Sequence, residues 1–103
     1  MSNSALTEAV YYILLSLMEP RHGYGIMQNV AGLSGGRVKL AAGTLYGAIN
    51  ALLEKGWITA LPEEKESRKK EYQITAQGKR MLADELTRLR ELITNGERVL
   101  EAK

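Results

Sequence analysis

A five-residue run, Gly43-Thr44-Leu45-Tyr46-Gly47, opens a segment whose apolar spacing predicts a helix over residues 42–55. Gly56 follows at the position where glycine commonly ends a helix. Two strand-like segments come next, at residues 57–61 and 70–74, and they predict a β-hairpin. A helix followed directly by a β-ribbon is the order of a winged helix. The run therefore constrains the fold, which we expect to be mainly α with a small β-ribbon.

Two apolar helices are expected before this run. The first spans about Ala5 to Met18, with Ser4 as its N-cap. Because this helix is apolar nearly all round, we expect it to be buried on more than one face, with one face against another subunit. Residues 19–21 break the helix, and a second one follows over about residues 23–31. Residues 37–40 read as a short strand or an extended link.

The last segment predicts a long helix over about residues 76–102, with Thr75 as its N-cap. Its apolar side chains recur at alternating spacings of four and three, which is the pattern of a coiled-coil seam. A helix of this length spans roughly 40 Å, more than a small winged domain covers. We expect it to kink or fray at Asn95-Gly96. The predicted dimer contacts are Leu82, Leu86, Leu89, Ile93 and Leu100, with Tyr11 and Leu15 from the first helix.

This reading divides the chain into a winged helix-turn-helix DNA-binding domain over residues 1–75 and a dimerisation helix over residues 76–103.

The composition excludes several other classes of protein. The chain has 103 residues, with 14 basic and 12 acidic ones, and this net charge of +2 is too weak to indicate nucleic acid by itself. The absence of cysteine and the single histidine exclude a disulfide framework and a metal cluster, so no cofactor is expected.

The longest apolar run has about ten residues, whereas a membrane span needs roughly 20. The N-terminus lacks the basic start of a signal peptide, so we expect a cytoplasmic protein with no membrane partner. The chain shows no nucleophile–base pair and no phosphate-cradling glycine loop with a lysine, so an enzyme is not expected.

The predicted helix over residues 42–55 has one apolar and one small polar face. The apolar face carries Leu45, Ile49, Leu52 and Leu53, and the opposite face carries Gly43, Gly47, Asn50 and Glu54, with Thr44 and Tyr46 at the boundary. Asn50 has the chemistry to pair with adenine, and the hydroxyls of Thr44 and Tyr46 suit phosphates. In an alternative reading, the glycines pack against a neighbouring helix and Tyr46 is a half-buried anchor.

The loop between the two strands is charged but has no net charge over residues 63–71. Such a loop is usually only solvated. Three cations nevertheless adjoin one another where the second strand begins, a position suited to phosphates or a minor groove. The candidate DNA-binding cations are Lys65, Arg68, Lys69 and Lys70 in the wing, with Arg37 and Lys39 before the recognition helix.

Taken together, several blocks resemble the PadR family of bacterial transcriptional regulators, in the family order over roughly residues 9–82. The blocks are Tyr12-Ile13-Leu14 with Leu17, His22-Gly23-Tyr24-Gly25-Ile26, Gly43-Thr44-Leu45-Tyr46, Leu52 with Glu54-Lys55-Gly56-Trp57-Ile58, and Arg68-Lys69-Lys70-Glu71-Tyr72-Gln73-Ile74-Thr75 with Gly78 and Leu82. The resemblance implies a dimeric repressor that binds operator DNA. A single C-terminal helix is typical of the short form of the family. Gly47 departs from the pattern, which usually has proline there.

The resemblance also implies release by a small aromatic effector, because some members sense phenolic acids or flat aromatic drugs at the dimer interface. Tyr11, Tyr12 and Leu15 are the candidate pocket residues, although an aromatic stripe at this spacing is more often core. We expect His22 to cap or pack on the second helix, and Trp57 to pack at the base of the wing.

The functional prediction is a homodimeric repressor on double-stranded DNA with a pseudo-palindromic operator. The alternative is a winged-helix module that binds another protein.

Overall fold

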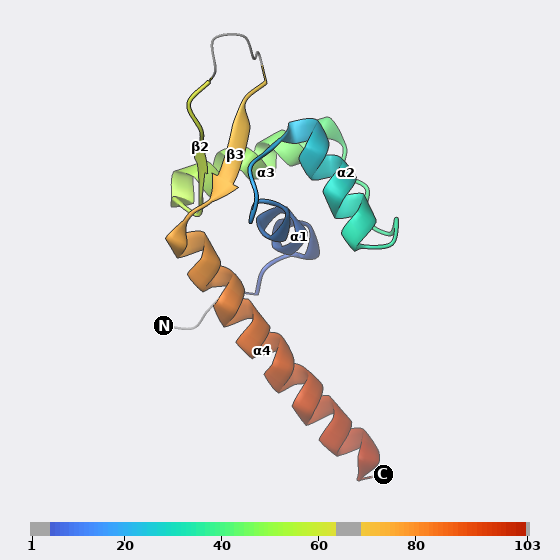
Figure 1. The fold of residues 1–103 in the computed structure, drawn as a ribbon. Helices are drawn as coiled ribbons and strands as arrows, with labels where there is room; N and C mark the ends of the chain where they lie inside the picture. Colours follow the sequence, from blue (N-terminus) through green and yellow to red (C-terminus); the bar gives the residue numbers. More distant parts are fainter. Residues whose placement is uncertain (1–4, 64–68, 103) are drawn as a thin grey trace.

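The computed structural model describes residues 5–63 and 69–102, which form four helices and a small antiparallel sheet (Figure 1). The order of elements confirms the predicted fold, mainly α with a β-ribbon and a long final helix. In chain order the elements are α1 (Glu8–Ser16), β1 (Arg21–His22), α2 (Gly23–Leu33), α3 (Ala42–Lys55), β2 (Ile58–Ala60), β3 (Glu71–Ile74) and α4 (Ala76–Glu101).

The sheet contains one strand more than the sequence predicts. Its order is β1-β3-β2, and both pairs are antiparallel. Residues 19–21 were expected only to break the first helix, but Arg21 pairs with Tyr72 and His22 with Glu71. A strand of two residues has no alternation to detect, so its pairing is visible only in the folded chain. It places the start of α2 beside the base of the wing.

The hydrophobic core lies where the three N-terminal helices meet the sheet and the first turns of α4. Of the four residues of α3 predicted to face inward, Leu45, Ile49 and Leu52 are buried and Leu53 is half-buried. The buried core consists of Ile13, Leu14, Leu17, Ile26, Val30, Leu45, Ile49, Leu52, Ile58, Tyr72, Ile74 and Leu82.

The first two helices differ from the prediction at their ends. α1 begins at Glu8 instead of Ala5, because the Thr7 side chain accepts a hydrogen bond from the Val10 N–H at 3.1 Å and caps the helix there. Ser4, the predicted cap, lies outside the described residues. α2 continues to Leu33, two residues beyond its predicted end. Of the two readings for residues 37–40, the extended link is confirmed.

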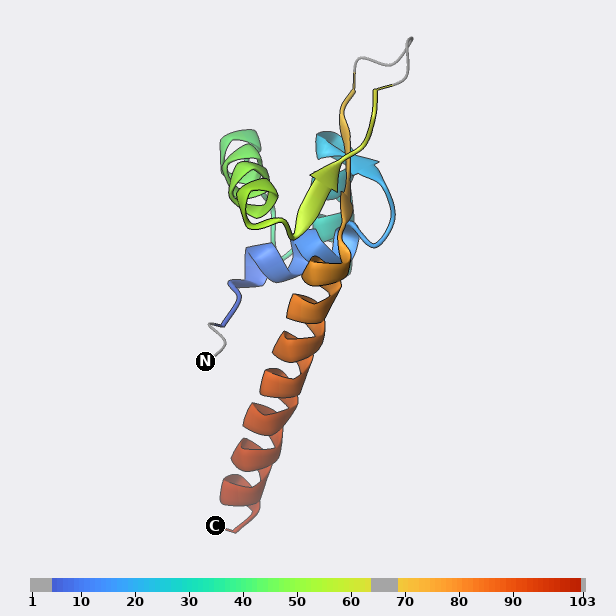
Figure 2. The ribbon, with the colours of Figure 1, turned by 90° about the vertical axis from the view of Figure 1, so that its left-hand side faces the viewer.

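α4 runs without interruption from Ala76 to Glu101, so the kink predicted at Asn95-Gly96 is absent. The helix leaves the rest of the molecule like a rod, and the described chain measures 61 × 32 × 20 Å along its principal axes (Figures 1 and 2). Leu82, predicted to lie in the seam between chains, is only 6% exposed and belongs to the core of its own chain. The described helices include none that is both long and apolar enough to cross a membrane.

A tight joint holds α4 against the end of α3. Gly56 ends α3 in the left-handed region at φ 75°, as its position predicts, and Thr75 caps α4 by accepting from the Gly78 N–H. The Thr75 hydroxyl donates to the Gly56 carbonyl at 2.7 Å, and the Thr75 N–H donates to the Trp57 carbonyl at 2.9 Å. These bonds fix the direction in which α4 leaves the domain.

Candidate nucleic-acid interface

The outward face of α3 is exposed and small, as the sequence predicts. Gly43, Thr44, Tyr46, Gly47 and Asn50 are all exposed. A Cβ built at either glycine of this face would meet no atom of the described chain within 4 Å, apart from its chain neighbours and the adjacent backbone of α3 itself. The alternative in which these glycines pack against a neighbouring helix of the same chain is therefore wrong.

Tyr46 lies at the edge of this face and leans toward the start of α2. Its side chain is 46% exposed. A Cβ added to Gly23 would overlap the Tyr46 hydroxyl oxygen and would lie 2.7 Å from the ring carbon that carries it. Tyr46 is thus exposed and not the half-buried anchor of the alternative interpretation, but its hydroxyl rests on the backbone of Gly23.

The structure brings three of the predicted DNA-binding residues into one hollow of about 380 Å³. The hollow lies between the start of α2, the exposed side of α3 and the base of the wing. It is lined by Tyr46, Lys69 and Lys70, which the sequence predicts, and by His22, Gly23, Tyr24 and Tyr72, to which it assigns no DNA contact. We call this the α2–α3–wing hollow. The block from His22 to Ile26 was a signal for the family, and only the pairing of β1 with β3 brings it to the wing.

His22 acts as the N-cap of α2. Its Nδ1 accepts a hydrogen bond from the Gly25 N–H at 3.3 Å. This confirms the capping role expected from its position. An accepting Nδ1 places the ring proton on Nε2 in this geometry.

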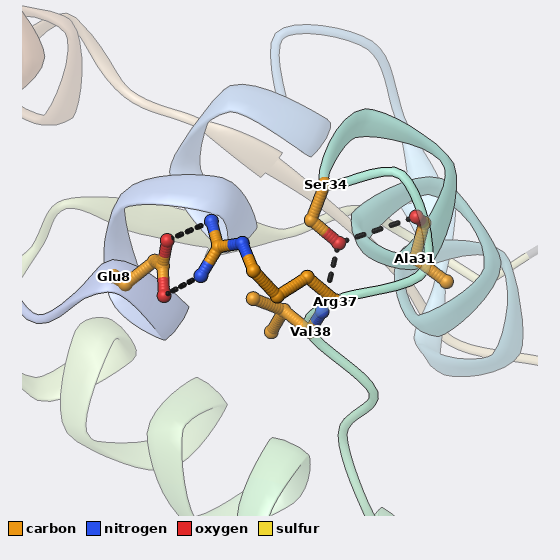
Figure 3. Close-up of polar contacts among 5 residues, drawn as sticks. All are labelled: Glu8, Ala31, Ser34, Arg37 and Val38. Atoms are coloured by element: carbon orange, nitrogen blue, oxygen red, sulfur yellow. Dashed lines mark hydrogen bonds and ion pairs between the residues drawn. The ribbon is translucent and has the colours of Figure 1, made fainter.

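The link that leads into α3 is tied to α1 and α2 (Figure 3). Ser34 Oγ donates to the Ala31 carbonyl at 3.2 Å and accepts from the Val38 N–H at 2.9 Å. Both terminal nitrogens of Arg37 bind the Glu8 carboxylate. This pairing lowers the pKa of Glu8 and raises the pKa of Arg37, chiefly through the side-chain hydrogen bonds. Arg37 is thus already paired in the free chain.

The other predicted cations are either exposed or outside the described residues. Lys39 is exposed in the link between α2 and α3. Lys69 and Lys70 are exposed where the described part of the wing resumes. Lys65 and Arg68 lie outside the described residues. The recognition helix and the base of the wing face the same end of the molecule, opposite the end from which α4 projects (Figure 2).

The far part of α4 exposes the predicted apolar stripe. Leu86, Ile93 and Leu100 are 37%, 59% and 77% exposed, and Leu89 is half-buried. Leu92 and Val99, which the seam pattern missed, are also more than half exposed and widen the stripe. Tyr11 and Leu15 on α1 are half-buried. Within one chain, the described residues leave most of this stripe uncovered.

Two of the three predicted effector residues share a second hollow of about 270 Å³. The rings of Tyr11 and Tyr12 meet edge to face, with centroids 5.8 Å apart. Leu15 does not line this hollow, contrary to the prediction. The other lining residues are Leu6, Glu8, Glu85, Arg88 and Leu89.

An ion pair forms the α4 side of this second hollow. Arg88 donates to both carboxylate oxygens of Glu85, at 2.8 and 2.6 Å. These hydrogen bonds lower the pKa of Glu85 against the opposing effect of burial, and the Leu6 backbone adds to the lowering. The Glu85 side chain is only 5% exposed.

Trp57 is half-buried at the base of the wing, as expected, with the Lys55 ammonium 4.8 Å from its ring centroid. Together they form part of a third, mainly apolar hollow of about 360 Å³ beside α1.

Comparison with solved structures finds the same fold in several regulators. A PadR family transcriptional regulator from Eggerthella lenta matches with a TM-score of 0.73 and 24% identity, over 91% of this chain and 82% of that one. A PadR-like transcription factor from Bacteroides fragilis matches with a TM-score of 0.71 and 22% identity, over 88% and 87% of the two chains. A PadR family regulator from Clostridium difficile matches with a TM-score of 0.70 and 22% identity, over 88% and 97%.

A comparison with curated protein sequences finds no match. The sequence model of the PadR-like transcriptional regulator family, however, matches residues 12–84, which include the core, the recognition helix and the wing. Members of this family are transcriptional regulators rather than enzymes. The chain therefore belongs to the PadR-like family and is a DNA-binding transcriptional regulator.

Proposed function

We propose that this protein is a repressor that acts in the cytoplasm as a homodimer on a pseudo-palindromic operator. The observation that carries the proposal is the open face of α3 beside a hollow lined by Lys69 and Lys70. The recognition helix α3 and the base of the wing, which border this hollow, lie at the end of the molecule opposite α4 (Figure 2). This arrangement suits DNA at one end and a second subunit at the other.

The exposed face of α3 would enter the major groove. Asn50 would read base edges there, because its amide suits the N6 and N7 atoms of adenine. Gly43 and Gly47 would allow close approach, and Thr44 would contact the backbone. The cations Lys39, Lys65, Arg68, Lys69 and Lys70 would hold phosphates. Arg37 would contact a phosphate only by breaking its ion pair with Glu8, so we expect it to contribute least to DNA binding.

The far part of α4 would form the dimer. Its stripe of Leu86, Leu89, Ile93 and Leu100 follows the coiled-coil spacing and is largely exposed in one chain. Half-buried Tyr11 and Leu15 on α1 would contribute at its edge. Two-fold symmetry would then place the recognition helices at half-sites roughly 34 Å apart, or at a multiple of that distance.

A flat aromatic compound is the effector class that the second hollow would take. Tyr11 and Tyr12 provide ring faces, and Arg88 provides a cation for an acidic substituent. Binding there would also touch Glu8, which holds Arg37 in the link before α3. An effector would therefore act on the recognition helix through this pair.

The test is binding of purified protein to its own upstream DNA, followed by fluorescence anisotropy at several salt concentrations. We expect affinity to fall steeply with salt, since phosphate contacts release counterions. Asn50→Ala should lose affinity for the operator but not for random DNA, whereas Asn95→Ala on α4 should match the wild type. An absence of salt-sensitive binding, together with capture of a protein partner, would favour the interaction module instead.

A reporter downstream of the same DNA separates repression from activation. Expression should fall when the protein is supplied, and it should recover with an effective aromatic compound. Expression that rises with the protein would refute the repressor role without affecting DNA binding.

A further inference from the structure

The Tyr72 hydroxyl in the α2–α3–wing hollow has no hydrogen-bond partner among residues 5–63 and 69–102. Tyr72 belongs to the core and is only 7% exposed. No described residue forms a hydrogen bond with this hydroxyl. Every polar side-chain atom of the described residues that is sealed from solvent does have a partner, so the Tyr72 hydroxyl must reach solvent. The hydroxyl therefore opens into the hollow that this residue lines. Phenylalanine would fill the same core position, so packing of the core does not require the hydroxyl.

The surroundings of this hydroxyl suit a negatively charged group. Lys69 and Lys70 line the hollow, and no carboxylate of the described chain does. Glu71 lies between Lys70 and Tyr72 in sequence, but successive side chains of a strand point to opposite faces. The eleven-residue helix α2 begins at Gly23 and directs the positive end of its dipole toward the hollow.

Two further hydroxyls come from separate elements. Tyr24, at the start of α2, is 63% exposed, and Tyr46 comes from the recognition helix. Because Gly23 has no side chain, the Tyr46 hydroxyl can lie against its backbone. This contact keeps the Tyr46 ring at the hollow. Burial, and then the proximity of Tyr46, raise the pKa of Tyr72. At neutral pH the Tyr72 hydroxyl is thus protonated and able to donate.

We propose that the α2–α3–wing hollow seats one phosphate of the DNA backbone, bound by the hydroxyls of Tyr24, Tyr46 and Tyr72 and by Lys70. The inference rests on the proposed operator binding and deepens it. It gives the Tyr46 hydroxyl, which the sequence already matches to phosphates, a defined place at one phosphate, and it adds Tyr24 and Tyr72 to the interface. A free phosphate group has the same chemistry, but the position between recognition helix and wing favours a phosphate of the bound duplex.

The first test removes one hydroxyl without changing charge. Tyr72→Phe should weaken operator binding at least tenfold, because a hydrogen bond to a charged group contributes about 1.5–3 kcal/mol. The salt slope should not change, since no cation is lost. Thr87→Val, which removes an exposed hydroxyl on α4, is the control and should bind as the wild type does. Melting temperatures of both variants establish that they are folded.

The second test changes the DNA. In a series of duplexes, one phosphate at a time is replaced by a neutral methylphosphonate. At one position in each half-site, the replacement should weaken binding of the wild type but should not weaken binding of Tyr72→Phe relative to the unmodified duplex. Such non-additivity identifies a direct contact. Wild-type binding with no effect of Tyr72→Phe and no such position would overturn the phosphate seat while leaving operator binding intact. Failure of the wild type to bind DNA at all would instead refute the proposed function.

A glycine pair on α2 gives an independent readout. Gly23→Ala should push the Tyr46 ring away and weaken operator binding, whereas Gly25→Ala should not, because its nearest neighbours lie 3.8 Å from an added Cβ. Equal affinities for the two folded variants would contradict the role of Tyr46. Inorganic phosphate should not raise the melting temperature at millimolar concentration. Stabilisation by phosphate that Tyr72→Phe abolishes, without coupling to any DNA phosphate, would overturn the assignment to the DNA backbone.

Discussion

A single methyl group at Gly78 should destabilise this protein, although alanine is the better helix former. Gly78 is the third residue of α4, and its N–H donates to the Thr75 cap. A Cβ built there would overlap the Trp57 carbonyl oxygen and would lie 2.6 Å from Ile74 Cγ1. The same carbonyl accepts the Thr75 N–H at 2.9 Å. The start of α4 therefore has to move away from β2 and β3.

The magnitude follows from three contributions. Forcing an extra carbon into a packed contact destabilises by about 1–3 kcal/mol. Weakening the hydrogen bond between Thr75 and Trp57 adds about 1 kcal/mol. The helix propensity of alanine returns up to about 1 kcal/mol. The expected net loss for Gly78→Ala is therefore about 1–3 kcal/mol, and each kcal/mol lowers the melting temperature by roughly 4–8 °C.

Gly47→Ala is the matched control, because it makes the same substitution in a helix with open space around it. It should stabilise the protein by about 1 kcal/mol. Both variants are measured by thermal and urea denaturation at one protein concentration, since dimerisation makes apparent stability depend on concentration. A Gly78→Ala protein that melts at or above the wild type would refute the packing argument. So would a destabilised Gly47→Ala protein, because no contact there explains a loss.

Three further predictions concern the rest of the molecule. Leu86→Asp combined with Ile93→Asp should convert the dimer to a monomer in sedimentation velocity, and a wild type that sediments as a folded monomer would contradict the seam. Lys70→Gln should reduce the slope of log affinity against log salt by about one unit, and an unchanged slope would remove it from the phosphate contacts. Arg88 lowers the pKa of Glu85, so this ion pair should stabilise the fold at pH values above the ordinary pKa of glutamate. That contribution should vanish as pH falls through the lowered pKa, and Glu85→Gln should flatten this acid limb in pH-dependent urea denaturation.

Local signals in the sequence were sufficient for most helix positions. The apolar spacing of Leu45, Ile49 and Leu52 located α3 and its buried face, because a side chain's face on a helix depends only on its position in the turn. Thr75 and Gly56 marked helix ends correctly, since capping acts over three or four residues. The start of α1 was misplaced because Thr7 and Ser4 are both good caps, and the sequence alone does not choose between them.

The candidate site was predictable only in part. Tyr46, Lys69 and Lys70 were singled out from their residue types and positions, and the structure places them around one hollow. Tyr24 and Tyr72 were not, because their relevance depends on β1, a strand of two residues that pairs with one about fifty positions away. Arg37 looked like a free cation because Glu8, its partner, lies 29 residues away in the chain.

The sequence by itself determined the order of helices and ribbon, the two faces of the recognition helix and the apolar stripe of α4. Each of these depends on interactions between residues that are near neighbours along the chain. Only the tertiary structure decided that Leu82 belongs to the core rather than to the seam, and that Gly78 has no space for a side chain. It also decided that tyrosines from α2, α3 and β3 line one hollow. These outcomes depend on how separate elements pack, and packing brings together residues that no local pattern connects.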